Sequence, residues 1–139
     1  MPFTTAQEAE DAYYDALEEG DLDKLMSVWA DDDNIGCLLP MQPLATGRAA
    51  VTRGWQELFE AAGTVDLQAS HVTWIDLGDA AIHLVEEIMA ATPGAPPPPG
   101  VYATNIFVKG PDGWRLVMHQ NSPLPPPPGF QQPGMSHLP

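Results

Sequence analysis

Two adjacent carboxylates, Glu86 and Glu87, lie in the middle of the apolar segment 82–89. Successive side chains of an extended segment point to opposite faces, so we expect one of these carboxylates on each face of a sheet. A carboxylate that faces a cavity has a raised pKa and can act as a general base. Contact with solvent or with a second subunit is the alternative for both residues, and the sequence leaves it open.

The chain contains four histidines, and none has the HxH or HExxH spacing that is typical of zinc sites. His71 and His83 could approach each other across a hairpin, but the sequence identifies no further ligand beside them. We therefore expect no metal site and no cofactor. Cys37 is the single cysteine, and no base lies near it in the sequence. We expect this thiol to be buried and unreactive.

The last apolar segment, 114–121, contains two competing candidates for a pocket. Alternation assigns His119 to the same face as Arg115, and it assigns Gln120 to the same face as Trp114. If Arg115 faces solvent or a partner subunit, His119 does so too, and Gln120 takes the position in the pocket. A shift of one residue in register would exchange the two candidates.

These side chains must be positioned by helices in the first half of the chain and by strands in the second. Thr5 caps a helix that ends at Gly20, and Asp21 caps a second, short helix. Thr46 is expected to cap a third helix, which ends at Gly63. These capping residues and the apolar periodicity between them predict three helices.

Alternating apolar residues predict a short strand in 34–40 and longer strands in 65–75, 80–90, 101–109 and 114–121. Tight turns join several of these strands, so we expect an antiparallel meander with the helices on one face, an α+β fold. The proline-rich segment 92–100 is predicted to be an extended loop, and the proline-rich segment 123–139 an arm.

Length and charge exclude several classes of partner. A chain of 139 residues favours one domain, and 19 acidic residues against 5 basic ones give a net charge of -14. Such a surface repels phosphate groups, so we expect binding neither to nucleic acid nor to membranes. The chain has no apolar run near the roughly 18 residues of a membrane span and no visible secretory signal. We expect a cytoplasmic protein.

Several short strings resemble, in order and spacing, the SnoaL-like domain family of the nuclear-transport-factor-2-like superfamily. They are EEGDLD at 18–23, WADD at 29–32, TGR at 46–48 before Trp55, and DGWRLV at 112–117 before His119. The resemblance spans about 5–123. It implies a cystatin-like cone, in which three N-terminal helices pack on a strongly curved, mostly antiparallel sheet around a pocket. It also implies homodimers that form through the sheet. We expect a SnoaL-like domain at 1–122 and the arm at 123–139.

The resemblance also suggests residues for the site. The donor tyrosine of steroid-isomerase-like members aligns with Tyr13, and their second donor falls near Thr104 or Asn105. Their catalytic base falls near Cys37, where this chain has no carboxylate. Our candidates for catalysis are Tyr13, Glu86, Glu87 and His119. Our candidates for ligand contact are Trp29, Trp55, Tyr102, Asn105 and Gln120.

Three functions remain open at this point. The first is binding of a small apolar or aromatic molecule without catalysis, which the missing carboxylate near Cys37 favours. The second is an isomerase- or dehydratase-type enzyme that uses general acid–base chemistry in the same pocket. The third is a non-catalytic interaction module that uses its proline-rich arm. The first two differ in whether an ionisable side chain reaches the pocket.

Overall fold

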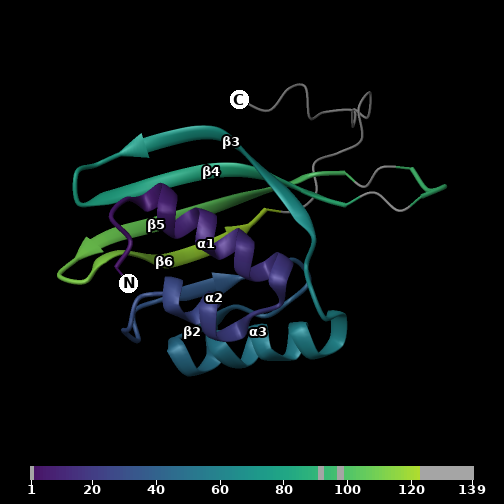
Figure 1. The fold of residues 1–139 in the computed structure, drawn as a ribbon, viewed down its shortest axis with the longest axis horizontal. Coiled ribbons are helices and arrows are strands. Elements are labelled where there is room, and N and C mark those ends of the chain that lie inside the picture. The colour runs from purple at the N-terminus through teal and green to yellow at the C-terminus, as the bar shows by residue number, and fades with distance from the viewer. Residues whose placement is uncertain (1, 91–92, 97–98, 123–139) are drawn as a thin grey trace, which may run out of the picture.

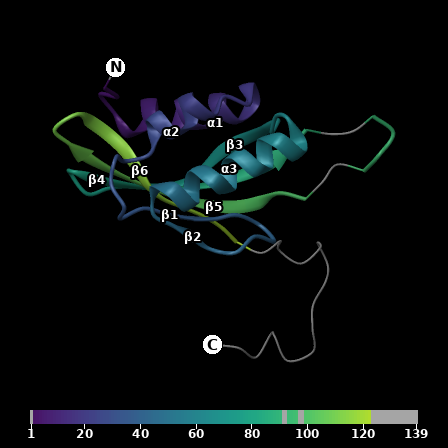
Figure 2. The same ribbon diagram turned by 90° about the horizontal axis from the view of Figure 1, so that it is seen from below.

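The computed structural model describes residues 2–90, 93–96 and 99–122. Within them, helices α1 (Ala6–Glu19), α2 (Leu22–Val28) and α3 (Arg48–Ala62) lie on one face of a curved, six-stranded sheet (Figures 1 and 2). The strands are β1 (Gly36–Leu38), β2 (Ala45–Thr46), β3 (Leu67–Asp76), β4 (Ala80–Met89), β5 (Val101–Gly110) and β6 (Gly113–Asn121). This arrangement confirms the predicted cystatin-like α+β fold.

The strands follow the order β2-β1-β6-β5-β4-β3. Strand β1 runs parallel to β6, and every other pair in the sheet is antiparallel. The meander of β3 to β6 is the one that the tight turns predict. The arm predicted for 123–139 and parts of the predicted loop, 91–92 and 97–98, lie outside the described residues.

Local signals start and end the first two helices where the sequence places them. The backbone N–H of Glu8 donates to the Thr5 hydroxyl at the start of α1, and Lys24 N–H donates to the Asp21 carboxylate at the start of α2. Gly20 ends α1 in the left-handed conformation with φ 67°. No helix among the described residues is both long and apolar enough to cross a bilayer.

The start of α3 differs from the prediction. Thr46 lies in β2, and Gly47 is the N-cap residue without any side-chain hydrogen bond. The helix is instead held through Arg48, whose guanidinium donates to the carbonyl oxygens of Met26 at 2.8 Å and Ala30 at 3.0 Å. These contacts fix α3 against the end of α2, so tertiary contacts supply the anchoring that we expected from a local cap.

The alternation in β6 is broken by one residue. Ile106 pairs with Met118 and Phe107 pairs with Leu116, so Val117 is left without a partner in a β-bulge. Leu116 and His119 therefore point to the same side, toward the helices, and are 0% and 1% exposed. Strict alternation places Leu116 on the face of Trp114 and Gln120, opposite His119, and this expectation was wrong because the bulge inserts an extra residue between them.

Candidate functional site

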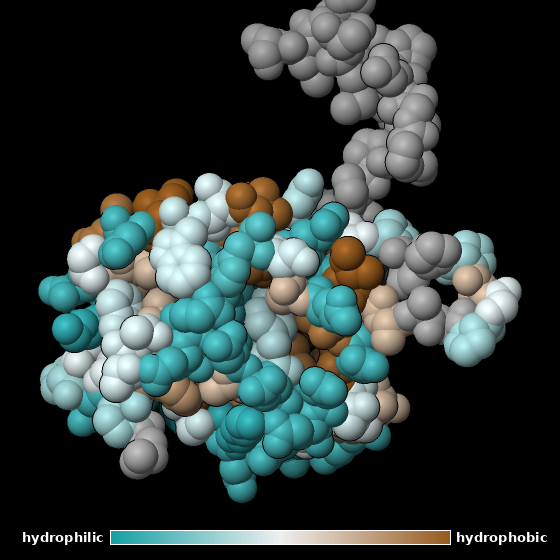
Figure 3. Space-filling view, turned by 45° about the horizontal axis from the view of Figure 1, so that its top comes forward, coloured by the Kyte–Doolittle hydropathy of each residue, from teal (hydrophilic) through white to brown (hydrophobic). Residues whose placement is uncertain are grey.

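A cavity of about 420 Å³ lies between α1, α3 and the inner face of the sheet, and we call it the inner cavity. Most of its lining is apolar, and Figure 3 shows apolar side chains, in brown, recessed among polar ones on one face of the molecule. The lining residues are Tyr13, Leu17, Leu39, Pro40, Gln42, Trp55, Leu58, Val65, Leu67, Glu87, Met89, Pro99, Val101, His119 and Asn121.

Most of the polar part of this lining comes from the two strands that carry Glu87 and His119, and Tyr13 and Gln42 supply the rest. Glu87 lies on β4, while His119 and Asn121 lie on β6, and all three side chains are buried. Glu87 Oε2 is 3.9 Å from His119 Nε2. Two groups that can carry protons therefore reach the same cavity. The catalytic alternative requires an ionisable side chain in the pocket, and this requirement is met.

Five side chains close a ring of hydrogen bonds around these groups, which we call the hydrogen-bond ring. The Tyr14 hydroxyl donates to Glu87 Oε2 at 2.7 Å, and Asn121 Nδ2 donates to Glu87 Oε1 at 2.8 Å. Asn121 Oδ1 lies 2.9 Å from His119 Nε2. His119 Nδ1 lies 2.6 Å from Asn105 Oδ1, and Asn105 Nδ2 donates to the Tyr14 hydroxyl at 3.0 Å.

The hydrogen-bond ring gives the Asn105 and Asn121 amides the same orientation, with the amino group toward a glutamate and the oxygen toward His119. Asn105 Nδ2 also donates to Glu10 Oε2 at 3.0 Å, so the amino groups of Asn105 and Asn121 each donate to a glutamate. Both amides consequently present their oxygens to His119. A neutral imidazole carries one N–H, so it can satisfy only one of these oxygens, whereas an imidazolium would donate to both.

Burial works against that charged form. It lowers the pKa of His119, and the nearby Glu87 charge and the Asn121 hydrogen bond offset this effect only in part. The resting imidazole is therefore neutral near pH 7, although its two amide partners are arranged for the protonated ring. Both amide oxygens would accept hydrogen bonds from His119 if the ring took up a proton.

Burial keeps two phenols protonated: Tyr14, which is part of the hydrogen-bond ring, and Tyr13, which lies beside it. Burial, assisted by the Glu87 charge, raises the pKa of Tyr14. Burial raises the pKa of Tyr13 as well, and the charge on Glu87 adds to the effect. The Tyr13 hydroxyl has no hydrogen-bond partner among the described residues, and its ring packs edge-on against Trp55 at 6.0 Å. It remains a free donor beside the inner cavity.

The structure distributes the predicted site residues between three places. Tyr13, Trp55, Glu87 and His119 line the inner cavity, and Asn105 supports His119 from behind. Trp29 is buried in the core at the end of α2. The remaining candidates lie on the outer side of the sheet, away from the cavity: Glu86, Tyr102 and Gln120.

The bulge at Val117 explains why Gln120 lies outside and His119 inside. Tyr102 pairs with Glu86 across β4 and β5 on the same outer face, so neither reaches the cavity. Sequence reasoning also missed Tyr14 and Asn121. Tyr14 lies four residues after Glu10 on α1, a spacing that places both on one helix face, and Asn121 shares a strand face with His119.

A second group of ionisable residues lies beyond Asn105 and could hold a metal. Glu10, His71 and His83, which we call the Glu10 cluster, bring one potential ligand atom each within 4.8 Å of one another. Burial tends to raise the pKa of Glu10, but contacts with His83, Asn105 and His71 outweigh it and hold this pKa below its usual value. The third ligand that the sequence did not reveal is thus Glu10 on α1.

A larger hollow of about 540 Å³ runs along α3 and shares four lining residues with the inner cavity: Leu39, Gln42, Trp55 and Leu58. Its one nucleophile is Cys37, and burial raises the pKa of this thiol to about 12. The thiol is therefore not ionised at neutral pH and is a poor nucleophile. The proton-carrying groups make the smaller inner cavity the better candidate site.

Comparison with known proteins agrees with this architecture. A crystal structure from Thiobacillus denitrificans, provisionally assigned as a calcium/calmodulin-dependent protein kinase type II association domain, is 42% identical and has a TM-score of 0.84. The match covers 90% of this chain and 99% of that one. A provisionally assigned dehydratase of the NTF2-like family from Streptomyces avermitilis is 30% identical, with a TM-score of 0.73 over 85% of this chain and 92% of that one.

A protein of unknown function from Nostoc punctiforme with a cystatin-like fold is 13% identical and shares the fold, with a TM-score of 0.69 over 87% of this chain and 93% of that one. Comparison with curated protein sequences finds no match. The SnoaL-like domain family matches residues 7–126, which is most of the sequence. The chain therefore belongs to the SnoaL-like domain family, within the NTF2-like superfamily.

Proposed function

We propose that this chain binds a small, mainly apolar molecule in the inner cavity, and that the molecule carries an oxygen atom that accepts hydrogen bonds. The observation that carries this proposal is an apolar cavity of about 420 Å³ whose polar groups are few and gathered together. Pockets of this character, with an apolar lining and a few oriented polar groups, are typical of small-molecule sites. The unpartnered Tyr13 hydroxyl is the donor that would meet the oxygen atom.

Filling the cavity tests this proposal. Leu67 lines the inner cavity at the start of β3, and Leu67→Trp would occupy part of the space. Leu77→Trp is the matched control, because Leu77 is exposed in the turn after β3. Native mass spectrometry of the freshly purified protein would detect a retained molecule, and a fragment library followed by NMR would detect weaker ligands. Ligands that bind Leu67→Trp as well as the unchanged chain would refute binding in this cavity.

A second candidate function is general acid–base catalysis at the same site. Glu87 and His119 line one cavity 3.9 Å apart, and the Streptomyces avermitilis relative is provisionally assigned as a dehydratase. Glu87 would remove a proton from a carbon beside a carbonyl group. It would return this proton to another carbon, which is isomerisation, or to a departing hydroxyl, which leaves as water. The Tyr13 hydroxyl, which has no partner among the described residues, would donate to the carbonyl oxygen and stabilise the negative charge that develops there.

The variant Glu87→Gln separates catalysis from binding. Glutamine retains the shape and an accepting oxygen for Asn121, but it cannot transfer a proton. Conversion of 3-hydroxy ketones and of unsaturated ketones would be followed by the ultraviolet absorbance of the conjugated product. For a substrate that the unchanged chain converts, we expect the rate to fall by about 100-fold or more, with binding retained. Equal rates in both proteins would exclude Glu87 as the base.

We also propose that the outer face of the sheet forms a homodimer. Helices lie on the inner face, while Ile75, Ile88 and Tyr102 remain 44%, 38% and 41% exposed on the outer face. Such an apolar face favours association. Light scattering on the full chain should give twice the chain mass, and Ile88→Lys should give a single chain mass. A monomer at all concentrations would contradict this proposal.

A further inference from the structure

We propose that the Glu10 cluster is a binding site for a divalent transition-metal ion of the zinc type, separate from the inner cavity. The three side chains come from different elements: Glu10 from α1, His71 from β3 and His83 from β4. Two imidazoles and one carboxylate are a ligand set that suits zinc and its neighbours in the first transition row.

The first support is that His83 lacks any other partner. Its side chain is 0% exposed, and neither ring nitrogen has a hydrogen-bond partner within the part of the chain that the structure describes. Aromatic rings surround it, with Trp74 at 3.9 Å and Phe107 at 5.1 Å between ring centroids. Buried polar atoms normally have partners, so these two nitrogens require an explanation. Coordination of an ion by one of them provides it.

The second support is the distance from His83 to Glu10. His83 Nδ1 lies 3.1 Å from Glu10 Oε1, close enough for a hydrogen bond, but the ring is not aligned for one. A hydrogen bond requires the ring nitrogen to point at the carboxylate oxygen, whereas a metal ion lies to one side of the line between two of its ligand atoms. Coordination therefore does not require His83 Nδ1 to point at Glu10 Oε1. Two ligand atoms at about 2.1 Å from an ion are about 3.0 Å apart at a right angle and about 3.4 Å apart in a tetrahedron. The observed distance lies in this range.

His71 must move slightly to complete the site. Its Nε2 lies 2.6 Å from Glu10 Oε1, so the two atoms must separate by about 0.4–0.8 Å to share an ion at those ligand distances. The side chain of His71 is 37% exposed and lies on the edge strand β3, where it has room to rotate. The buried pair Glu10 and His83 is thus already spaced for an ion, and the half-exposed ligand is the one that adjusts.

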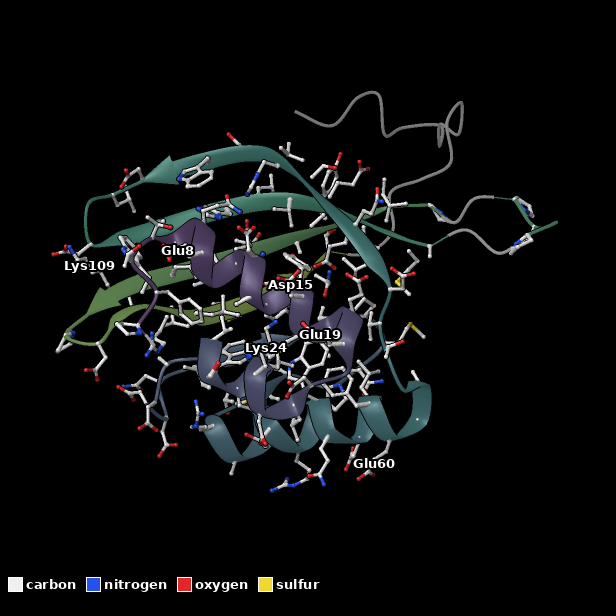
Figure 4. All side chains as sticks on the ribbon, in the orientation of Figure 1. Glu8, Asp15, Glu19, Lys24, Glu60 and Lys109 are labelled. Atoms are coloured by element: carbon white, nitrogen blue, oxygen red, sulfur yellow. The ribbon has the colours of Figure 1, made fainter. Side chains whose placement is uncertain are left out.

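The surroundings favour a cation. Asn105 Nδ2 donates to Glu10 Oε2 and so holds the carboxylate with Oε1 directed to the two histidines, as outer hydrogen bonds do in metal sites. A cleft of about 320 Å³ opens beside Glu10 and His71, and Asp11 and Asp15 line it. Figure 4 shows Asp15 on α1 with further acidic side chains along the same helix. Together with a net charge of -14, these carboxylates attract cations to the opening.

Isothermal titration of the full chain, without a polyhistidine tag, with Zn²⁺ tests the proposal. We expect one ion per chain, and His71→Ala should weaken binding about 100-fold or more, since outer-shell losses alone cost 10- to 100-fold. His71 is half-exposed, so this variant is expected to fold, and circular dichroism checks that it does. Gln68→Ala removes an exposed side chain from the outer face of the same strand and is the matched control. Equal affinity of His71→Ala and the unchanged chain would overturn the proposal, as would the absence of a one-to-one complex.

A second measurement is independent of the His71 variant. The Trp74 ring lies 3.9 Å from His83 and 5.1 Å from His71, so Cu²⁺ bound at the cluster should quench Trp74 fluorescence. Trp74→Phe should remove most of the quenching while one ion still binds. Quenching that persists at full strength in Trp74→Phe would place the ion elsewhere and refute the site.

Discussion

Replacement of Asn105 by leucine should destabilise the protein strongly, because this one amide holds three partners in the interior. Its Nδ2 donates to Glu10 Oε2 and to the Tyr14 hydroxyl, both at 3.0 Å, and its Oδ1 lies 2.6 Å from His119 Nδ1. The side chain is 0% exposed, so water does not replace these contacts. Leucine has a similar size and would fit on β5 without supplying any of them.

The expected magnitude follows from what each partner loses. Tyr14 still donates to Glu87, so its loss is small. Glu10 Oε2 and His119 Nδ1 are left unpaired, and each such buried group costs about 1–3 kcal/mol. Leucine is more hydrophobic than asparagine, and its burial offsets roughly 1 kcal/mol of this sum, which is about the free energy gained when one methylene group leaves water. We therefore expect Asn105→Leu to lower the free energy of unfolding by about 1–5 kcal/mol.

Urea unfolding at pH 7.5, followed by tryptophan fluorescence and circular dichroism, measures this change. Thr104→Val is the control, because Thr104 is the neighbour on β5 whose side chain lies on the outer face. The control should change the free energy of unfolding by less than about 1 kcal/mol, as is usual for substitutions away from buried networks. A decrease in the free energy of unfolding of less than about 1 kcal/mol for Asn105→Leu would refute the reasoning, because it would mean that Glu10 and His119 are not left unpaired in the interior.

Three further predictions concern other parts of the chain. Burial lowers the pKa of His119 in the folded protein, so the unfolded chain takes up a proton first as the pH falls, and the free energy of unfolding decreases below about pH 6.5 by up to about 1.4 kcal/mol per pH unit. His119→Phe should flatten the dependence of the urea-derived free energy of unfolding on pH in this range. An unchanged slope would contradict His119 as its origin. Gly20→Ala should lower the free energy of unfolding, measured by thermal unfolding, by at least about 1 kcal/mol, because φ is 67° and a Cβ would lie 2.6 Å from the Gly63 carbonyl oxygen. Gly54→Ala in α3 should instead raise it by roughly 0.5–1 kcal/mol, since a Cβ there meets nothing. A smaller effect at Gly20 than at Gly54 would argue against the left-handed cap. Since burial raises the pKa of Cys37 to about 12, a thiol reagent at pH 8 should modify it slowly in the native protein and rapidly in urea, and equal rates would show that the thiol is accessible.

The sequence alone determined the order of the three helices and of every strand except β2, together with most of their ends. Thr5, Gly20 and Asp21 act through contacts within a few residues, so their roles can be read without the tertiary structure. Alternating apolar residues and tight turns likewise predict the strands of the meander. The resemblance of several short strings to the SnoaL-like family then identified the superfamily, which the family match and the structural relatives confirm.

The tertiary structure alone decided which side chains meet at the site. Glu86 and Glu87 are equivalent in the sequence, and only the packing of the helices on one face makes Glu87 the buried one. His119 faces inward because the pairing of β6 with β5 inserts a bulge at Val117, and a pattern of period two cannot reveal such a shift. Glu10 meets His71 and His83 because α1 packs on the inner face of the sheet, in contact with β3 and β5 on either side of β4. Local signals determine where helices and strands begin and end, whereas long-range pairing and packing determine which side chains lie next to one another. The chemistry of this protein depends on the second.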